Sequence, residues 1–281
     1  MKKFWIRTAS SVLYVAAFLG TMYSGVLLKN KVAGSWIFLA FLTIIAIGCT
    51  YEFYKIANLK DIHPIKWLGY IGTISIVLAG TEFDVAEGTL YIPLAISITL
   101  IIIGMPTAAI IQLWRKSDSP FSDIGYTIIP WFYIGIPLAA ASLLQNINTN
   151  TLMTVVALVW INDACAYMIG SLIGKHKMWE RHSPGKTWEG TIAGVVFACI
   201  AGVIAVRYIN LAITEWYYGI LLGVICGVIG TLGDLVESML KRSVGIKDSG
   251  KFLPGHGGFL DRFDSLLILI PFATIFIVII M

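Results

Sequence analysis

The sequence predicts an all-α integral membrane protein whose chain crosses the bilayer about nine times. Of its 281 residues, 58% are hydrophobic and only 13% are charged, whereas about a quarter of the residues of a soluble domain are charged. The apolar residues gather in long segments, and the Lys and Arg residues lie mainly in every second connection between them. The formal net charge of +4 is too small to indicate a nucleic-acid partner.

The apolar segments are long enough, or nearly so, to span a hydrocarbon core that needs about 20 helical residues. The nine segments are Phe4–Leu28, Trp36–Ala57, Trp67–Thr81, Leu90–Trp114, Ile124–Gln145, Leu152–Ile173, Thr191–Ile209, Trp216–Glu237 and Phe263–Met281. The third is short, and the eighth ends in polar residues. Each should be helical, because backbone groups inside a bilayer must pair within the segment. The first is too long for a signal peptide, so we expect it to be retained.

The orientation follows from the basic residues. With the N-terminus in the cytoplasm, every Lys and Arg except Lys29, Lys31 and Arg207 falls on the inner side. Basic residues favour the cytoplasmic side of membrane proteins. We therefore expect the N-terminus inside and the C-terminus outside.

The chain has no visible internal repeat, and its four cysteines lie singly in apolar stretches. We expect a region of N-terminal transmembrane helices over residues 1–150 and a region that carries the chemistry over residues 151–281. The two longest polar stretches, Gly174–Gly190 and Ser238–Arg262, then lie on the same cytoplasmic face. This face is the expected place of a functional site.

Two carboxylate pairs flank the second polar stretch. Asp234 and Glu237 end one apolar segment, and Asp261 and Asp264 begin the last. Residues three apart share a helix face, and acidic residues near a bilayer are costly and usually functional. Clustered carboxylates suit Mg²⁺, which binds hard oxygen ligands together with substrate phosphates.

The same stretch carries basic and glycine residues that suit phosphate binding. A metal–phosphate site would use the acids for the cation and the bases for phosphate oxygens, and glycine backbones can turn their N–H groups toward an anion. The candidates are Lys241, Arg242, Lys247, Lys251 and Arg262, together with His256, Gly257 and Gly258. The glycine run is also consistent with a plain tight turn.

The first polar stretch offers Ser183, Lys186 and Thr187 as phosphate contacts. The alternative is a basic anchoring loop in which Thr187 caps the next helix. Asp163 lies inside an apolar segment. It should face a wet cavity or the bundle interior, either as a site residue or as a structural hydrogen-bonding group.

Several motifs resemble those of phosphatidate cytidylyltransferases, also called CDP-diacylglycerol synthases. The resemblance runs through residues 238–264, with Ser238-Met239-Leu240-Lys241-Arg242, Lys247-Asp248, Leu253-Pro254, His256-Gly257-Gly258-Phe259 and Asp261-Arg262-Phe263-Asp264. Earlier blocks are Asp163-Ala164-Cys165-Ala166-Tyr167 and Lys186-Thr187-Trp188-Glu189-Gly190. The first 150 residues resemble the family only in hydropathy. Gly185 departs from it, because many members have a second lysine there.

The resemblance implies transfer of CMP from CTP to phosphatidic acid, with release of pyrophosphate. It implies Mg²⁺, with a second, monovalent cation as companion, and a homodimer in the inner (plasma) membrane with the active site on the cytoplasmic face. By the same analogy Asp234, Asp261 and Asp264 are the metal ligands, and Asp248 and Glu237 assist them.

Three other functions are compatible with parts of the sequence. A CTP-dependent lipid kinase would use the same nucleotide and metal but transfer the γ-phosphoryl group. A transporter or channel would spread its charged residues through the middle of the membrane, whereas here they gather on one face. A membrane scaffold would leave the paired carboxylates without a role.

Overall fold

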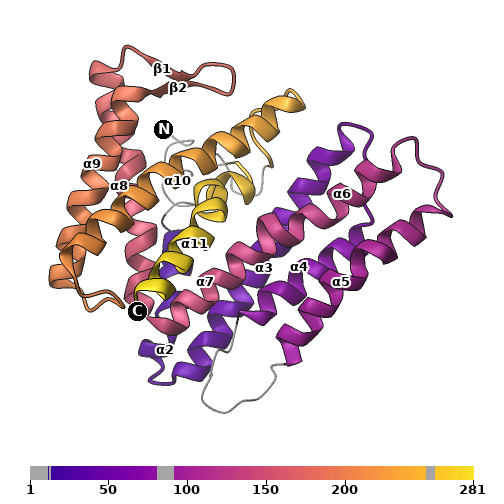
Figure 1. The fold of residues 1–281 in the computed structure, drawn as a ribbon, viewed down its shortest axis with the longest axis horizontal. Helices are drawn as coiled ribbons and strands as arrows, with labels where there is room; N and C mark the ends of the chain where they lie inside the picture. Colours follow the sequence, from indigo (N-terminus) through magenta and orange to yellow (C-terminus); the bar gives the residue numbers. More distant parts are fainter. Residues whose placement is uncertain (1–11, 13, 81–91, 251–256) are drawn as a thin grey trace. The chain divides into compact units, whose positions relative to one another are not determined.

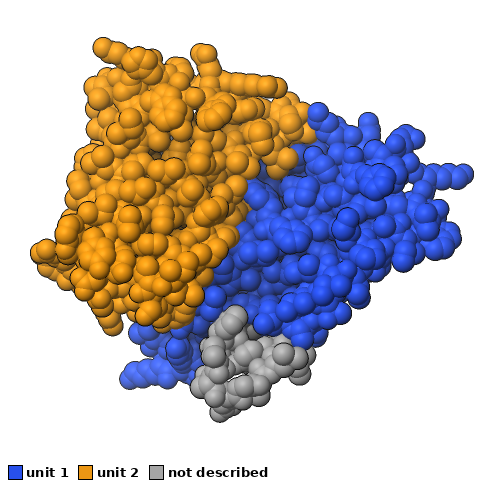
Figure 2. Space-filling view, viewed as in Figure 1, with its two compact units in different colours: residues 1–146, 248–262 blue, residues 147–247, 263–281 orange. Residues whose placement is uncertain are grey.

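The computed structural model describes residues 12, 14–80, 92–250 and 257–281. Within these residues the protein is a set of long helices with one short β-hairpin (Figure 1). The chain divides into two compact units, which Figure 2 shows in different colours. Unit 1 comprises residues 1–146 and 248–262, and unit 2 comprises residues 147–247 and 263–281.

Unit 1 is built from the N-terminal helices. They are α2 (Ser24–Leu27), α3 (Lys31–Asn58), α4 (Lys66–Ala79), α5 (Ile92–Gln112), α6 (Pro120–Pro130), the π-helix η2 (Trp131–Gly135) and α7 (Ile136–Ile147). Helix α4 packs against both α3 and α5. The last three elements form one continuous apolar stretch, Pro120–Ile147.

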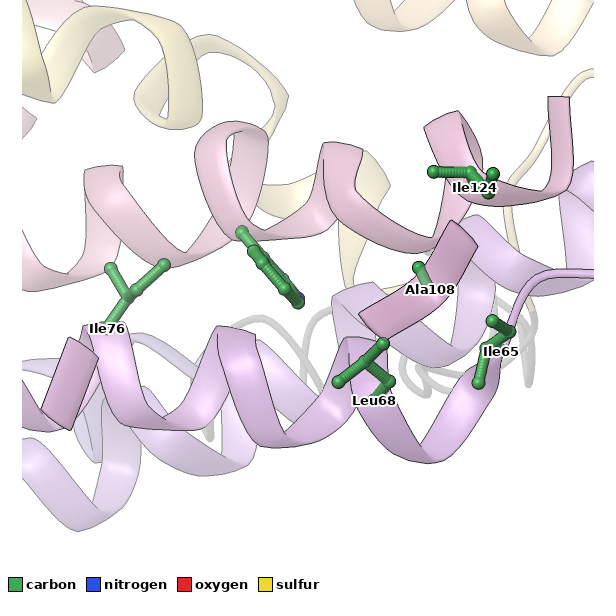
Figure 3. Packing of buried hydrophobic residues seen from close by; sticks show 6 residues of the cluster. Ile65, Leu68, Ile76, Ala108 and Ile124 are labelled. Atoms are coloured by element: carbon green, nitrogen blue, oxygen red, sulfur yellow. The ribbon is translucent and has the colours of Figure 1, made fainter. Parts of the chain in front are cut away.

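The core of unit 1 centres on Trp131, whose side chain is buried. Its indole N–H donates a hydrogen bond to the carbonyl of Gly69 on α4 at 3.0 Å. Ile65, Leu68 and Ile76 belong to the same buried cluster (Figure 3). A buried indole needs such a partner for its polar end, so this bond fixes how η2 sits on α4.

Unit 2 holds the C-terminal helices and the hairpin. Its elements are α8 (Thr149–Ile173), β1 (Lys177–Trp179), β2 (Ser183–Thr187), α9 (Trp188–Tyr208), α10 (Trp216–Ser243) and, from Phe263 onward, α11 (Leu260–Ile280). Helix α9 packs against α8 and α10. Gly202 and Gly219 let the backbones of α9 and α10 approach closely, as small residues do between membrane helices.

The hairpin lies at the ends of α8 and α9 (Figure 1). It pairs Lys177 with Thr187 and Trp179 with Ser183. Thr187 is the N-cap of α9, because its hydroxyl accepts a hydrogen bond from the backbone N–H of Gly190 at 3.2 Å. The capping role that we weighed for Thr187 is therefore observed, and the expected polar loop is a short β-hairpin.

Seven helices in the described ranges are long and apolar enough to cross a membrane. The protein is thus an all-α, multi-pass membrane protein, as predicted. The expected span Trp67–Thr81 corresponds to α4, which has 14 residues and would extend only about 21 Å at 1.5 Å per residue. The expected span Phe4–Leu28 begins in residues outside those described, so the number nine stays a prediction.

Candidate active site

Three carboxylates of unit 2 converge at one place. Asp234 and Glu237 on α10 and Asp264 on α11 each offer an oxygen, and these atoms lie within 4.8 Å of one another. Glu237 is fully buried, whereas Asp234 and Asp264 are partly buried. The approach of the two helices is close at Gly233, where a Cβ would collide with the backbone of Asp264 and Ser265. A side chain at position 233 would therefore separate the carboxylates.

Basic side chains balance these acids. The ammonium group of Lys186, from β2, lies 2.8 Å from Oδ2 of Asp234, and it donates to the carbonyl of Thr231 at 3.2 Å. Lys241 forms an ion pair with Glu237 one turn away on the same helix. The hydroxyl of Ser238 donates to the other oxygen of Asp234 at 3.3 Å. The first polar stretch and α10 thus meet within unit 2.

A cavity of about 400 Å³ opens beside the Lys186–Asp234 pair. It is lined by residues of α8, the hairpin, α9 and α10, among them Asp163, Ser183, Lys186, Thr187, Thr231 and Asp234. Asp163 therefore faces the same space as Lys186. Its carboxylate accepts a hydrogen bond from the side-chain amide of Asn162 at 3.2 Å, and that amide lies 3.3 Å from the hydroxyl of Thr231. Asp163 is an acidic member of the cavity wall and not a purely internal group.

Asp261 belongs to unit 1 and accepts hydrogen bonds from other residues of that unit. One oxygen of its carboxylate accepts hydrogen bonds from the backbone N–H of Ser249 at 2.9 Å and the N–H of Gly258 at 2.7 Å, and it lies 3.0 Å from the hydroxyl of Ser249. The structure does not include Asp261 in the group formed by Asp234, Glu237 and Asp264. Asp261 instead links the first turn of α11 to Ser249 and Gly258.

Glu52 on α3 is a buried acid that contacts Ser249 and Leu260. It is not among the candidates predicted from the sequence. Its carboxylate accepts hydrogen bonds from the hydroxyl of Ser249 at 2.7 Å and from the N–H of Leu260 at 3.0 Å. The available signal was an acid inside the apolar run Trp36–Ala57, since buried acids normally require partners. Nothing in the sequence pointed to the partner, which lies almost 200 residues away.

Among the remaining candidates, Arg242 and Lys247 belong to unit 2 and Asp248 belongs to unit 1. The guanidinium of Arg242 donates to the carbonyl of Ile246 at 2.9 Å, and Lys247 and Asp248 are exposed. Gly257, with φ at +82°, occupies the left-handed region that favours glycine. Arg262 belongs to unit 1, and Lys251 and His256 lie outside the described residues.

Comparison with known proteins places the chain in a family. A family model described as "Cytidylyltransferase family" matches residues 5–280. A protein of Staphylococcus saprophyticus named phosphatidate cytidylyltransferase is 30% identical over 278 residues, which cover 97% of this chain and 98% of that protein. A protein of the same name from Staphylococcus aureus is 30% identical over 97% of this chain and 98% of its own. Another from Staphylococcus haemolyticus is 36% identical over 58% of this chain and 62% of its own. The chain therefore belongs to the cytidylyltransferase family.

Proposed function

We propose that this protein is a phosphatidate cytidylyltransferase, which transfers CMP from CTP to phosphatidic acid to give CDP-diacylglycerol and pyrophosphate. A phosphate oxygen of the lipid forms a bond to the α-phosphorus of CTP. The bond between that phosphorus and the bridging oxygen to the β-phosphate breaks, and pyrophosphate leaves with the electron pair. Transfers of this kind depend mainly on positioning and charge stabilisation. The family membership, the relatives' names and the chemistry of the cavity support the proposal.

The observation that carries the proposal is the pairing of Lys186 with Asp234 at the wall of the cavity. A lysine ammonium neutralises phosphate oxygens and can donate three hydrogen bonds. Ser183 and Thr187 line the same cavity, and Thr191 adds a third hydroxyl-bearing side chain to its wall. Lys186, Ser183 and Thr187 bind and orient phosphates in a partly enclosed space, where electrostatic attraction is stronger than in water.

The three converging carboxylates fit a magnesium ion. Asp234, Glu237 and Asp264 supply hard oxygen donors close enough to share one ion, which is the donor chemistry that Mg²⁺ prefers. A bound Mg²⁺ would neutralise the negative charge that phosphates carry during transfer. Asp261 remains a ligand predicted by the resemblance, with Asp248 and a monovalent companion ion as further predictions.

The membrane arrangement extends this proposal. The bacterial relatives point to the plasma membrane, and the distribution of Lys and Arg favours nine spans with the N-terminus inside and the active site at the cytoplasmic face. There a soluble nucleotide and a bilayer-anchored lipid can both reach the cavity. The homodimer that the resemblance implies stays a prediction.

The experiment follows the label of CTP. Purified protein in detergent receives phosphatidic acid, Mg²⁺ and CTP labelled at either the α- or the γ-phosphate. We expect the α-label in the lipid fraction and one pyrophosphate per labelled lipid. Transfer of the γ-label to lipid would identify a lipid kinase, and the absence of both products would overturn the proposal. Omission of phosphatidic acid controls for simple CTP hydrolysis.

A further inference from the structure

An apolar groove of about 380 Å³ lies next to the polar cavity in unit 2. Its walls come from the hairpin, α9 and α10, and they include Trp179, Trp188, Ile192, Val196, Val228 and Leu232. All six side chains are exposed in the structure. The groove therefore offers hydrocarbon surface but hardly any polar group to a ligand.

The groove and the cavity share two wall residues, Thr191 and Thr231. Both hydroxyls already have a partner: that of Thr191 donates to the sulfur of Met178 at 3.4 Å, and that of Thr231 lies 3.3 Å from the Asn162 amide. The groove and the cavity are thus adjacent, separated by Thr191 on α9 and Thr231 on α10. On one side stand Lys186 and the carboxylates, and on the other side only apolar surface.

We propose that this groove binds an acyl chain of the phosphatidic acid whose phosphate lies at Lys186, which rests on the proposed function. The spatial order of charged and apolar surface in the protein matches the order of headgroup and acyl chain in this lipid. An anionic head followed directly by a hydrocarbon chain is the chemistry of a phospholipid with a small headgroup, and the cavity and groove present a cation and then apolar walls in that order. The ribose and triphosphate of a nucleotide are polar and would gain little from these apolar walls.

The two indole rings suit the mouth of such a groove. Trp179 on β1 and Trp188 at the start of α9 are 49% and 47% exposed, and both belong to the groove. Tryptophan is enriched where the headgroup level meets the hydrocarbon. A chain entering between these rings would pass from that level to Ile192, one turn after Trp188 on α9, and to Val228 on α10.

The test fills the groove without touching the cavity. Ile192→Trp and Val228→Trp place bulk in it, and Ile200→Trp is the matched control, because Ile200 is an exposed aliphatic residue on α9 outside the groove. Initial rates are measured with dioleoyl and with dibutanoyl phosphatidic acid. We expect kcat/KM for the dioleoyl substrate to fall about tenfold, as the loss of contact with about two methylene groups predicts. The dibutanoyl substrate, the KM for CTP and the Ile200→Trp variant should change less than about twofold.

Equal losses on both substrates, or no loss, would overturn the groove as an acyl site. A second measurement does not need turnover: a phosphatidic acid with a diazirine near the end of one acyl chain should label the α9 segment around Ile192. Lys186→Ala should reduce this labelling, whereas labelling by an equivalent phosphatidylcholine probe should not depend on Lys186. Labelling that ignores the headgroup would indicate general bilayer lipid, and a changed oligomeric state in Ile192→Trp would indicate a contact between protomers. Either result overturns the inference. If wild-type protein forms no CDP-lipid, the proposed function fails, while the labelling still decides the groove.

Discussion

The hydroxyl of Ser249 lies 2.7 Å from the buried carboxylate of Glu52, a residue 197 positions earlier in the chain. The same hydroxyl is 3.0 Å from the carboxylate of Asp261. Since a serine hydroxyl has one proton, it can donate to only one of these acids at a time. Ser249 and Leu260, the first residue of α11, are therefore held on α3 by a small network of hydrogen bonds.

We predict that Glu52→Ala lowers the stability of the protein. It removes the Glu52 acceptor of the Leu260 N–H, and a buried group left unsatisfied costs about 1–3 kcal/mol, whereas the hydroxyl of Ser249 can still donate to Asp261. Glu52→Gln keeps a carbonyl acceptor and should lose less. Thermal unfolding in detergent, followed by size-exclusion chromatography, measures the effect. Glu180→Ala in the exposed hairpin tip is the control, and a Glu52→Ala protein as stable as wild type would refute the network's role.

Lys186→Ala should mainly impair the use of substrate phosphates. A charge-assisted hydrogen bond of this kind contributes about 1.5–3 kcal/mol, which corresponds to a loss of roughly ten- to a hundredfold in kcat/KM. Lys177→Ala is the matched control, because Lys177 is an exposed lysine of the same hairpin that does not line the cavity. Steady-state kinetics with CTP and phosphatidic acid report the change. Unaltered kinetics in Lys186→Ala would show that the lysine does not contact substrate phosphates and serves only as a basic residue of the cytoplasmic loop.

Replacement of Asp234, Asp264 or Asp261 by Ala should nearly abolish turnover per folded molecule. If the residues act as one metal site, their losses are not additive, and the triple variant should be scarcely worse than the worst single one. The alternative for Asp261 follows from its hydrogen bonds to Ser249 and Gly258: loss of stability with near-normal activity. Magnesium-dependent CDP-lipid formation and thermal unfolding, measured on the same samples, separate the two. Full activity of Asp261→Ala would remove it from the ligands.

Gly185→Lys should strengthen nucleotide binding. Gly185 lines the cavity, and a Cβ built there meets no other atom within 4 Å, so a side chain fits without displacing its surroundings. An added partly exposed charge contributes up to about 1 kcal/mol, and we expect the KM for CTP to fall about threefold. Gly185→Gln adds similar bulk without charge and should leave the KM near that of wild type. A Gln variant that matches the Lys variant would show that charge is not the cause.

The two ends of α8 should face opposite sides of the membrane. In a variant without its native cysteines, single cysteines near Asn148 and at Lys177 mark these ends, since α8 runs from Thr149 to Ile173. A membrane-impermeant maleimide should label the first from outside in intact cells and the second only after permeabilisation. Labelling of both from the same side would refute the orientation derived from Lys and Arg.

The helical membrane fold could be predicted because hydropathy alone requires it. The carboxylates of the unit 2 site could be predicted as candidates because Asp234, Glu237 and Asp264 adjoin the ends of their apolar segments. Their meeting with Lys186 depends on how α10 packs beside the hairpin, which no local pattern encodes. The same reason explains why Glu52 was missed. Asp163 was left open because one polar residue in an apolar helix is equally consistent with a cavity wall and a buried hydrogen bond.

The hairpin has an exposed tip and a second strand that is fixed by hydrogen bonds. Thr187 pairs with Lys177 and caps α9, so the backbone next to Lys186 is tied to a helix end and to a neighbouring strand. Glu180 and Arg181 at the tip are exposed, and exposed loop tips tolerate insertion best. Engineered variants can therefore lengthen the tip while the lysine keeps its position, whereas one residue inserted between Lys186 and Thr187 would rotate the lysine away from the cavity.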